Sequence, residues 1–150
     1  MTLKCYKMSE LQWTLTGYTP YQWQMGGCRE VGIPCNPDVN TISASVPGSV
    51  QKALLDAGEI CDWNFGLNSR NLEWVENRHW LYEVYLPDSW FEKGKRYQLR
   101  ASGLDHKGRI YLNGELVYDF ANCHVEHIVE LTDSLKLESN LLQIMFECPP

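Results

Sequence analysis

The sequence has no apolar run that approaches the roughly 20 residues a membrane-spanning helix needs. It is also short of positive charge, with 13 Lys and Arg against 19 Asp and Glu and a formal net charge of −6. This balance argues against a nucleic-acid-binding or anionic-membrane surface, because both require an excess of basic side chains. The first residues, Met1 to Tyr6, contain no apolar h-region, so we expect no secretory signal peptide.

Motifs for cofactor and metal chemistry are missing as well. There is no Gly-rich phosphate loop, no G-x-S-x-G and no H-E-x-x-H, so we expect no cofactor. His124 and His127 are close in sequence, but in an extended strand their side chains point to opposite faces, which makes them poor co-ligands. We therefore expect no metal site.

Six cysteines are present, without a short repeated spacing. The closest pair, Cys28 and Cys35, is seven residues apart, which is neither a zinc-knuckle nor a thioredoxin spacing. Together with the absent signal peptide, this favours six free thiols and a cytoplasmic protein.

The composition fits one globular domain over residues 1–150, with 44% hydrophobic and 21% charged residues. Most of its periodic segments alternate with period two. The clearest is 80–86, where the even positions are apolar and share one strand face while Leu81, Glu83 and Tyr85 share the other. Further strands are expected at 11–18 (as an edge strand), 42–46, 97–101, 110–112, 116–118, 125–131 and 142–146.

Two local signals complete the secondary structure. Asn113-Gly114 is typical of a type I′ hairpin turn. Residues 50–57 have helical periodicity, with Ser49 placed to cap the start and Gly58 to close the end. Many short strands and one short helix predict an all-β sandwich.

The segment 62–80 is rich in Trp, Asn and Asp. Aromatic faces stack on the apolar faces of sugars, and carboxylates and amides hydrogen-bond their hydroxyls, so a carbohydrate contact is one interpretation. The other is a loop whose Trp side chains cover the end of the sandwich as a satellite core. Glu73 and Glu76 flank Trp74 and either face a cleft or lie on a solvated loop.

An ordered set of short motifs runs from about Trp13 to the C-terminus. The matching pieces are 46–50, 54–60, Asp62, Asn68, 73–76, 80–82, 103–105, 110–114, Asn122, 131–135, Asn140, Leu142 and Phe146. In this order they resemble the N-terminal domain of β-mannosidases in glycoside hydrolase family 2. Departures from the family pattern are Trp63 in place of a Pro, Ser69 in place of a Glu, and an insertion at 26–37.

The resemblance implies a galactose-binding-like jelly-roll sandwich that precedes an immunoglobulin-like domain and a (β/α)₈ barrel. The two catalytic glutamates of the family lie on that barrel, so none of these 150 residues matches them. We expect a non-catalytic domain that braces the barrel and supplies one wall of the pocket for a terminal β-mannoside. The candidate pocket-side residues are Asp62, Asn64, Asn68 and Trp74. Trp80, Asp105 and Asn113 are expected to be architectural.

Other functions stay open at this point. The chain could be the same domain from a β-galactosidase, β-glucuronidase or exo-glucosaminidase, or an independent carbohydrate-binding module that depends on Trp63 or Trp74. A protein-interaction module is a third possibility. If strands of the family's domain lie beyond Pro150, an open sheet edge would favour self-association, most simply a dimer.

Overall fold

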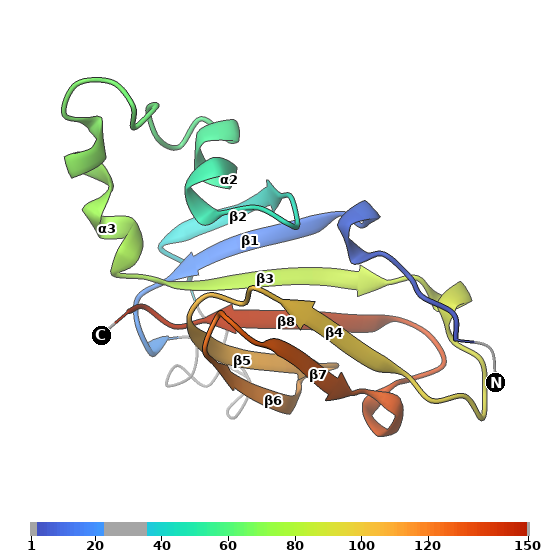
Figure 1. Cartoon of the computed structure of the whole chain (residues 1–150). Helices are drawn as coiled ribbons and strands as arrows, with labels where there is room; N and C mark the ends of the chain where they lie inside the picture. Colours follow the sequence, from blue (N-terminus) through green and yellow to red (C-terminus); the bar gives the residue numbers. More distant parts are fainter. Residues whose placement is uncertain (1–2, 23–35, 150) are drawn as a thin grey trace.

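Eight strands dominate the computed structural model, which describes residues 3–22 and 36–149 (Figure 1). Six of them form one antiparallel sheet in the order β2-β1-β3-β8-β5-β6. Their bounds are β1 Trp13–Tyr18, β2 Val39–Ala44, β3 His79–Leu86, β5 Lys107–Leu112, β6 Glu115–Ala121 and β8 Asn140–Phe146. The other two, β4 (Gln98–Ser102) and β7 (Glu126–Glu130), pair with each other as a second sheet. This confirms the predicted all-β sandwich.

The main core lies between the two sheets. Leu99 of β4 and Val129 of β7 pack in one cluster with inward-facing residues of the six-stranded sheet. Along β3 the even positions, from Trp80 to Leu86, all belong to this cluster, as the alternation predicts. Leu54 and Val75 join it from two short helices, so these helices are held by the core.

The opposite face of the six-stranded sheet carries a second, smaller apolar cluster. Tyr18, Leu81, Tyr111 and Met145 meet there, each 9% exposed or less. Beside them Glu83 accepts a hydrogen bond from Gln143 at 2.7 Å. This face is therefore largely buried, although the sequence pattern marks only one face of the sheet as core.

The predicted helix forms as α2 (Val50–Asp56). Ser49 caps it by accepting a hydrogen bond from the backbone N–H of Lys52 at 3.2 Å. Gly58, with φ +76°, closes it, and the Glu59 N–H donates to Leu54 O at 2.9 Å. This is the Schellman arrangement, which glycine favours because the position is left-handed.

Two expectations about the elements are wrong. Residues 11–18 do not form an edge strand, because β1 pairs with both β2 and β3 and the edge strands of this sheet are β2 and β6. The helix at 50–57 is also not alone: α3 (Glu73–Glu76) forms one turn where a loop was expected. The indole N–H of Trp80 donates to Val75 O at 2.9 Å, so a tertiary contact supports a helix too short to form by itself.

The turn between β5 and β6 has the predicted type I′ form, with positive φ at both Asn113 and Gly114. His127 is buried on β7, where its ring nitrogens contact the Tyr118 hydroxyl and Asn122 O. Cys5, Cys61, Cys123 and Cys148 are free thiols. Cys28, Cys35 and nearly all of the 26–37 insertion lie outside the described residues. In the described ranges, no helix is long and apolar enough to cross a bilayer.

Candidate functional site

The loop between α2 and α3 projects from one end of the sandwich (Figure 1). Asp62 Oδ1 accepts hydrogen bonds from both the backbone N–H and the side-chain amide of Asn64, each at 2.9 Å. The Asn68 side chain donates to Asp62 O at 2.8 Å. Three of the four candidate site residues therefore hold one another and fix the shape of the loop.

The tip of this loop is apolar. Phe65 is 69% exposed and Leu67 is 68% exposed. Backbone hydrogen bonds from Phe65 to Asp62 and from Asn68 to Phe65 keep the tip folded back on itself. The loop thus presents two large apolar side chains on a preformed turn, which is a feature of contact surfaces.

Trp74, the fourth candidate residue, lies apart from this hydrogen-bonded group. It is half-buried on α3, and its ring centroid is 6.3 Å from that of Trp80 at an interplanar angle of 48°. Trp80 is 5% exposed in the core. The satellite-core interpretation therefore holds in full for Trp80 and in part for Trp74.

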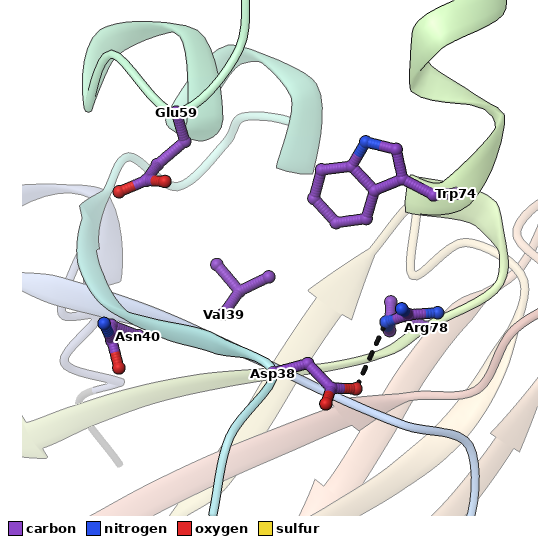
Figure 2. A pocket seen from close by; sticks show the side chains of 6 residues that line it. All are labelled: Asp38, Val39, Asn40, Glu59, Trp74 and Arg78. Carbon is purple, nitrogen blue, oxygen red and sulfur yellow. Dashed lines mark ion pairs between the residues drawn. The ribbon is translucent and has the colours of Figure 1, made fainter.

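Trp74 borders a hollow of about 290 Å³ together with Asp38, Val39, Asn40, Glu59 and Arg78. Figure 2 shows the polar side chains around the rim, with Val39 in the middle. Arg78 Nε lies 3.2 Å from Asp38 Oδ2, and the Thr19 hydroxyl also donates to that carboxylate oxygen. The Arg78 guanidinium lies 6.0 Å from the centre of the Trp74 ring.

None of Asp38, Asn40, Glu59 and Arg78 was expected from the sequence at this site. Asp38 and Asn40 lie just before and within the start of β2, Glu59 follows the end of α2, and Arg78 directly precedes β3, so only the fold brings them together. Of the residues that line the hollow, Trp74 is the one that the sequence analysis had singled out. Glu73 and Glu76 are both exposed on α3 and do not line this hollow.

The comparisons with known proteins agree with this architecture. The family model described as the glycosyl hydrolase 2 galactose-binding domain-like domain matches residues 23–150. The chain belongs to this family.

Curated proteins similar to this chain include β-mannosidase B of Emericella nidulans, which is 28% identical over 75% of the chain. β-Mannosidase B of Thermothelomyces thermophilus is 31% identical over 74% of the chain. The chain spans only 14% and 13% of these two proteins, respectively.

Solved structures show the same fold. The crystal structure of a β-D-mannosidase from Dictyoglomus thermophilum aligns with 98% of this chain and 16% of its own, at a TM-score of 0.78 and 22% identity. A β-glucuronidase from Ruminococcus gnavus aligns with 91% of this chain and 20% of its own, at a TM-score of 0.55 and 18% identity. The family model and the curated relatives confirm the glycoside hydrolase family 2 resemblance, and the solved structures confirm its fold.

Proposed function

We propose that this chain is the non-catalytic N-terminal domain of a β-mannosidase-type glycoside hydrolase that acts on terminal β-mannosides. The observation that carries the proposal is the match of about three quarters of the chain to curated β-mannosidases. The chain spans about one seventh of those proteins, which leaves room for the catalytic groups on further domains, where the proposal assigns them.

The activity test uses that complete polypeptide. Its release of the aryl group is measured from an aryl β-mannoside, β-galactoside, β-glucuronide and β-glucosaminide. A kcat/KM highest for the mannoside supports the proposal. A preference for any of the other three assigns the chain to another branch of the family and contradicts the proposal.

Within such an enzyme, the loop at 61–72 is the part we assign to the barrel and the substrate pocket. Asp62, Asn64 and Asn68 give it a fixed shape, and Phe65 and Leu67 form its apolar tip. Burying two such side chains against a neighbouring domain stabilises the contact by about 3–6 kcal/mol. Trp74 stands at the base of the loop, on the side of the hollow.

The loop assignment is tested by replacing Phe65 and Leu67 with Ser in the complete enzyme. We expect weaker docking, seen as a lower kcat/KM and faster proteolysis between domains, with little change in the stability of the 150-residue chain. Leu137→Ser is the matched control, because Leu137 is 76% exposed and lies in a different loop. Equal effects of the loop variant and the control would contradict the assignment.

The cellular site of the enzyme is part of the same proposal. The four described cysteines are free, which fits the reducing conditions of the cytoplasm. Fractionation of cells that express the complete protein, with detection by antibody, tests this directly, and recovery from the culture medium would contradict it.

A further inference from the structure

His79, the first residue of β3, is fully buried and contacts a residue of the turn that follows β1. The Tyr21 backbone N–H donates to His79 Nδ1 at 3.4 Å. The Tyr21 ring packs edge-on against the imidazole, with the ring centroids 5.0 Å apart at an interplanar angle of 70°. Tyr21 is itself 52% exposed, so its ring separates His79 from solvent. This hydrogen bond requires an Nδ1 without a hydrogen, which places the proton of the neutral ring on Nε2.

The turn that contains Tyr21 has a second attachment, which does not involve His79. The Thr19 hydroxyl donates to the Asp38 carboxylate, and the Gln22 backbone N–H donates to Thr19 O at 3.0 Å. Tyr21 has φ +66°, in the left-handed region that a Tyr rarely adopts. The contacts of the turn therefore hold Tyr21 in an unfavourable backbone conformation, and loss of its contact to His79 favours its release.

The charged groups that face His79 from β5 and β8 already bind one another. Glu147 follows β8, and its carboxylate lies 3.0 Å from Lys107 Nζ and 3.5 Å from Arg109 Nη2. Burial lowers the pKa of His79, Arg109 and Lys107 act in the same direction, and Glu147 opposes them. The one carboxylate of this group is thus occupied by two cations.

The neighbours on β1 and next to β3 offer no better partner for a charged ring. Tyr18 is the register partner of His79 on β1, and burial raises the pKa of its hydroxyl, which is therefore neutral at ordinary pH. Arg78 precedes His79 and pairs with Asp38 at 3.2 Å. His79 Nε2 is buried without a hydrogen-bond partner among residues 3–22 and 36–149.

A second proton on His79 is incompatible with this arrangement. Protonated Nδ1 would place its N–H opposite the N–H of Tyr21, so that two donors face each other. The imidazolium would also be buried beside carboxylates that are already paired, which is costly. Movement of Tyr21 away from the ring removes both problems, because water then reaches the imidazolium. A proton, like any ligand, shifts a conformational equilibrium toward the state that binds it better.

We propose that the contact between His79 and Tyr21 is a pH-sensitive switch, in which protonation of His79 releases Tyr21 from the start of β3 while the sandwich stays folded. Thr19 remains on Asp38, so the turn moves at Tyr21 and not as a whole. Deprotonation restores the acceptor at Nδ1 and the contact re-forms. The switch goes beyond the proposed function, because it belongs to the 150-residue chain and does not depend on which glycoside the complete enzyme hydrolyses.

The experiment is an NMR pH titration of the ¹⁵N,¹³C-labelled 150-residue chain between about pH 7.5 and 5. At pH 7.5 we expect the Nε2–H tautomer of His79 and nuclear Overhauser effects between the His79 and Tyr21 rings. These effects should fall at least about fivefold, with the same midpoint as the titration of the His79 ring. Effects between the Trp80 ring and Gly17 report the folded sheet and should persist. Ring contacts that survive the titration of His79, or that disappear only together with the Trp80–Gly17 contact, would overturn the switch.

The coupling is reciprocal, so a change at Tyr21 must alter the pKa of His79. Tyr21→Ala exposes the imidazole and is expected to raise the pKa of His79 toward its ordinary value of about 6.5. Tyr85→Ala is the matched control, because Tyr85 is 68% exposed on the same strand, six residues from His79, and should leave that pKa unchanged. The same pKa of His79 in both variants would contradict the proposal.

A non-titrating acceptor gives a second test. In His79→Asn the side-chain oxygen can accept the Tyr21 N–H at every pH of the titration. We expect the Tyr21 amide shift, which moves with pH in the original chain, to become independent of pH in this variant. A Tyr21 amide that still titrates in a folded His79→Asn would overturn the assignment to His79, and the Tyr21→Ala result decides if His79→Asn does not fold.

Discussion

The indole of Trp80 lies directly against Gly17 in the neighbouring strand. The two residues are register partners in the β1–β3 pair. A Cβ at position 17 would stand 2.7 Å from Trp80 Cζ3 and 3.0 Å from Val39 Cβ. Because the same indole donates to Val75 O, Gly17 allows the contact that ties α3, and with it Trp74, to the core.

Gly17→Ala is therefore expected to destabilise the chain by about 1–3 kcal/mol, the usual cost of overpacking a filled core. The free energy of unfolding in urea measures the loss. In a Trp80→Phe background, where Cζ3 and Cη2 of the indole are missing, the same substitution is expected to cost less. An equal cost in both backgrounds would show that the added Cβ at position 17 does not clash with the Trp80 indole.

Asn140 is the centre of a buried polar network at the other end of the sheet. It is fully buried, and its Oδ1 accepts from Asn113 Nδ2 at 2.9 Å and from Lys136 N at 2.8 Å. Its Nδ2 donates to Lys136 O at 2.9 Å. The network joins the β5–β6 turn to the segment that leads into β8.

Asn140→Leu is expected to destabilise the chain by about 2–4 kcal/mol, because it removes the side-chain partners of Lys136 N and Lys136 O and one of the two acceptors of Asn113 Nδ2. The control is Asn71→Ala at an exposed position, with an expected change below about 0.5 kcal/mol. Both are measured by urea unfolding. A similar small effect for the two variants would contradict the importance of the network.

Local signals account for the parts of the fold that the sequence predicts well. Strand β3 is recognisable because its alternation reflects one buried face, α2 because Ser49 and Gly58 end it, and the β5–β6 turn because Asn113 and Gly114 tolerate positive φ. The family resemblance adds the arrangement of the sandwich, which short-range patterns do not contain.

Contacts made only in the folded sandwich account for the parts that were missed. Helix α3 depends on the bond from the Trp80 indole to Val75 O, five residues earlier, with Trp80 itself held in the core. The hollow depends on the pairing of β2 with β1 and of β1 with β3, which brings Asp38 to Arg78. Neither relation has a periodic signature in the sequence. Asp62, Asn64 and Asn68 were grouped correctly in one loop, yet their hydrogen bonds point to one another instead of toward Trp74.

His79 is expected to make the stability fall at mildly acidic pH. It is fully buried, and this burial lowers its pKa below 6.5, with Arg109 and Lys107 acting in the same direction and Glu147 against them. Its Nδ1 faces the Tyr21 backbone N–H at 3.4 Å, and the Tyr21 ring packs at 5.0 Å.

The unfolded chain therefore binds a proton near pH 6.5 that the folded chain binds only at lower pH. The contribution of neutral His79 to the free energy of unfolding is fully present above about pH 6.5. It decreases as the pH falls from there to the pKa of His79 in the folded chain. Unfolding free energies measured between about pH 7.5 and 5.5 should show this slope. His79→Gln should reduce it, whereas His106→Gln, at an exposed position, should not. An unchanged slope in His79→Gln would assign the effect to another group.

Self-association is expected because the second sheet has only two strands. Strands β4 and β7 pair with each other and with no further strand of the described residues. Open strand edges pair readily with another chain, and a two-stranded sheet is marginal by itself. We expect a dimer of the 150-residue chain in sedimentation equilibrium over a concentration series. A strictly monomeric mass at the highest concentration would contradict pairing through these edges.

The 150-residue chain alone is expected to release no aryl group from an aryl β-mannoside. Retaining glycoside hydrolysis needs two carboxyl groups about 5–5.5 Å apart, one of them kept protonated near neutral pH by an apolar surrounding. Glu73 and Glu76 are the acids closest to Trp74 in sequence, but both are exposed on the single turn of α3. Release by the purified chain is compared with buffer alone and with the complete polypeptide. Turnover by the chain that survives purification and is lost in Glu73→Gln or Glu76→Gln would contradict the non-catalytic role, because it would place the reacting carboxylates on α3 itself.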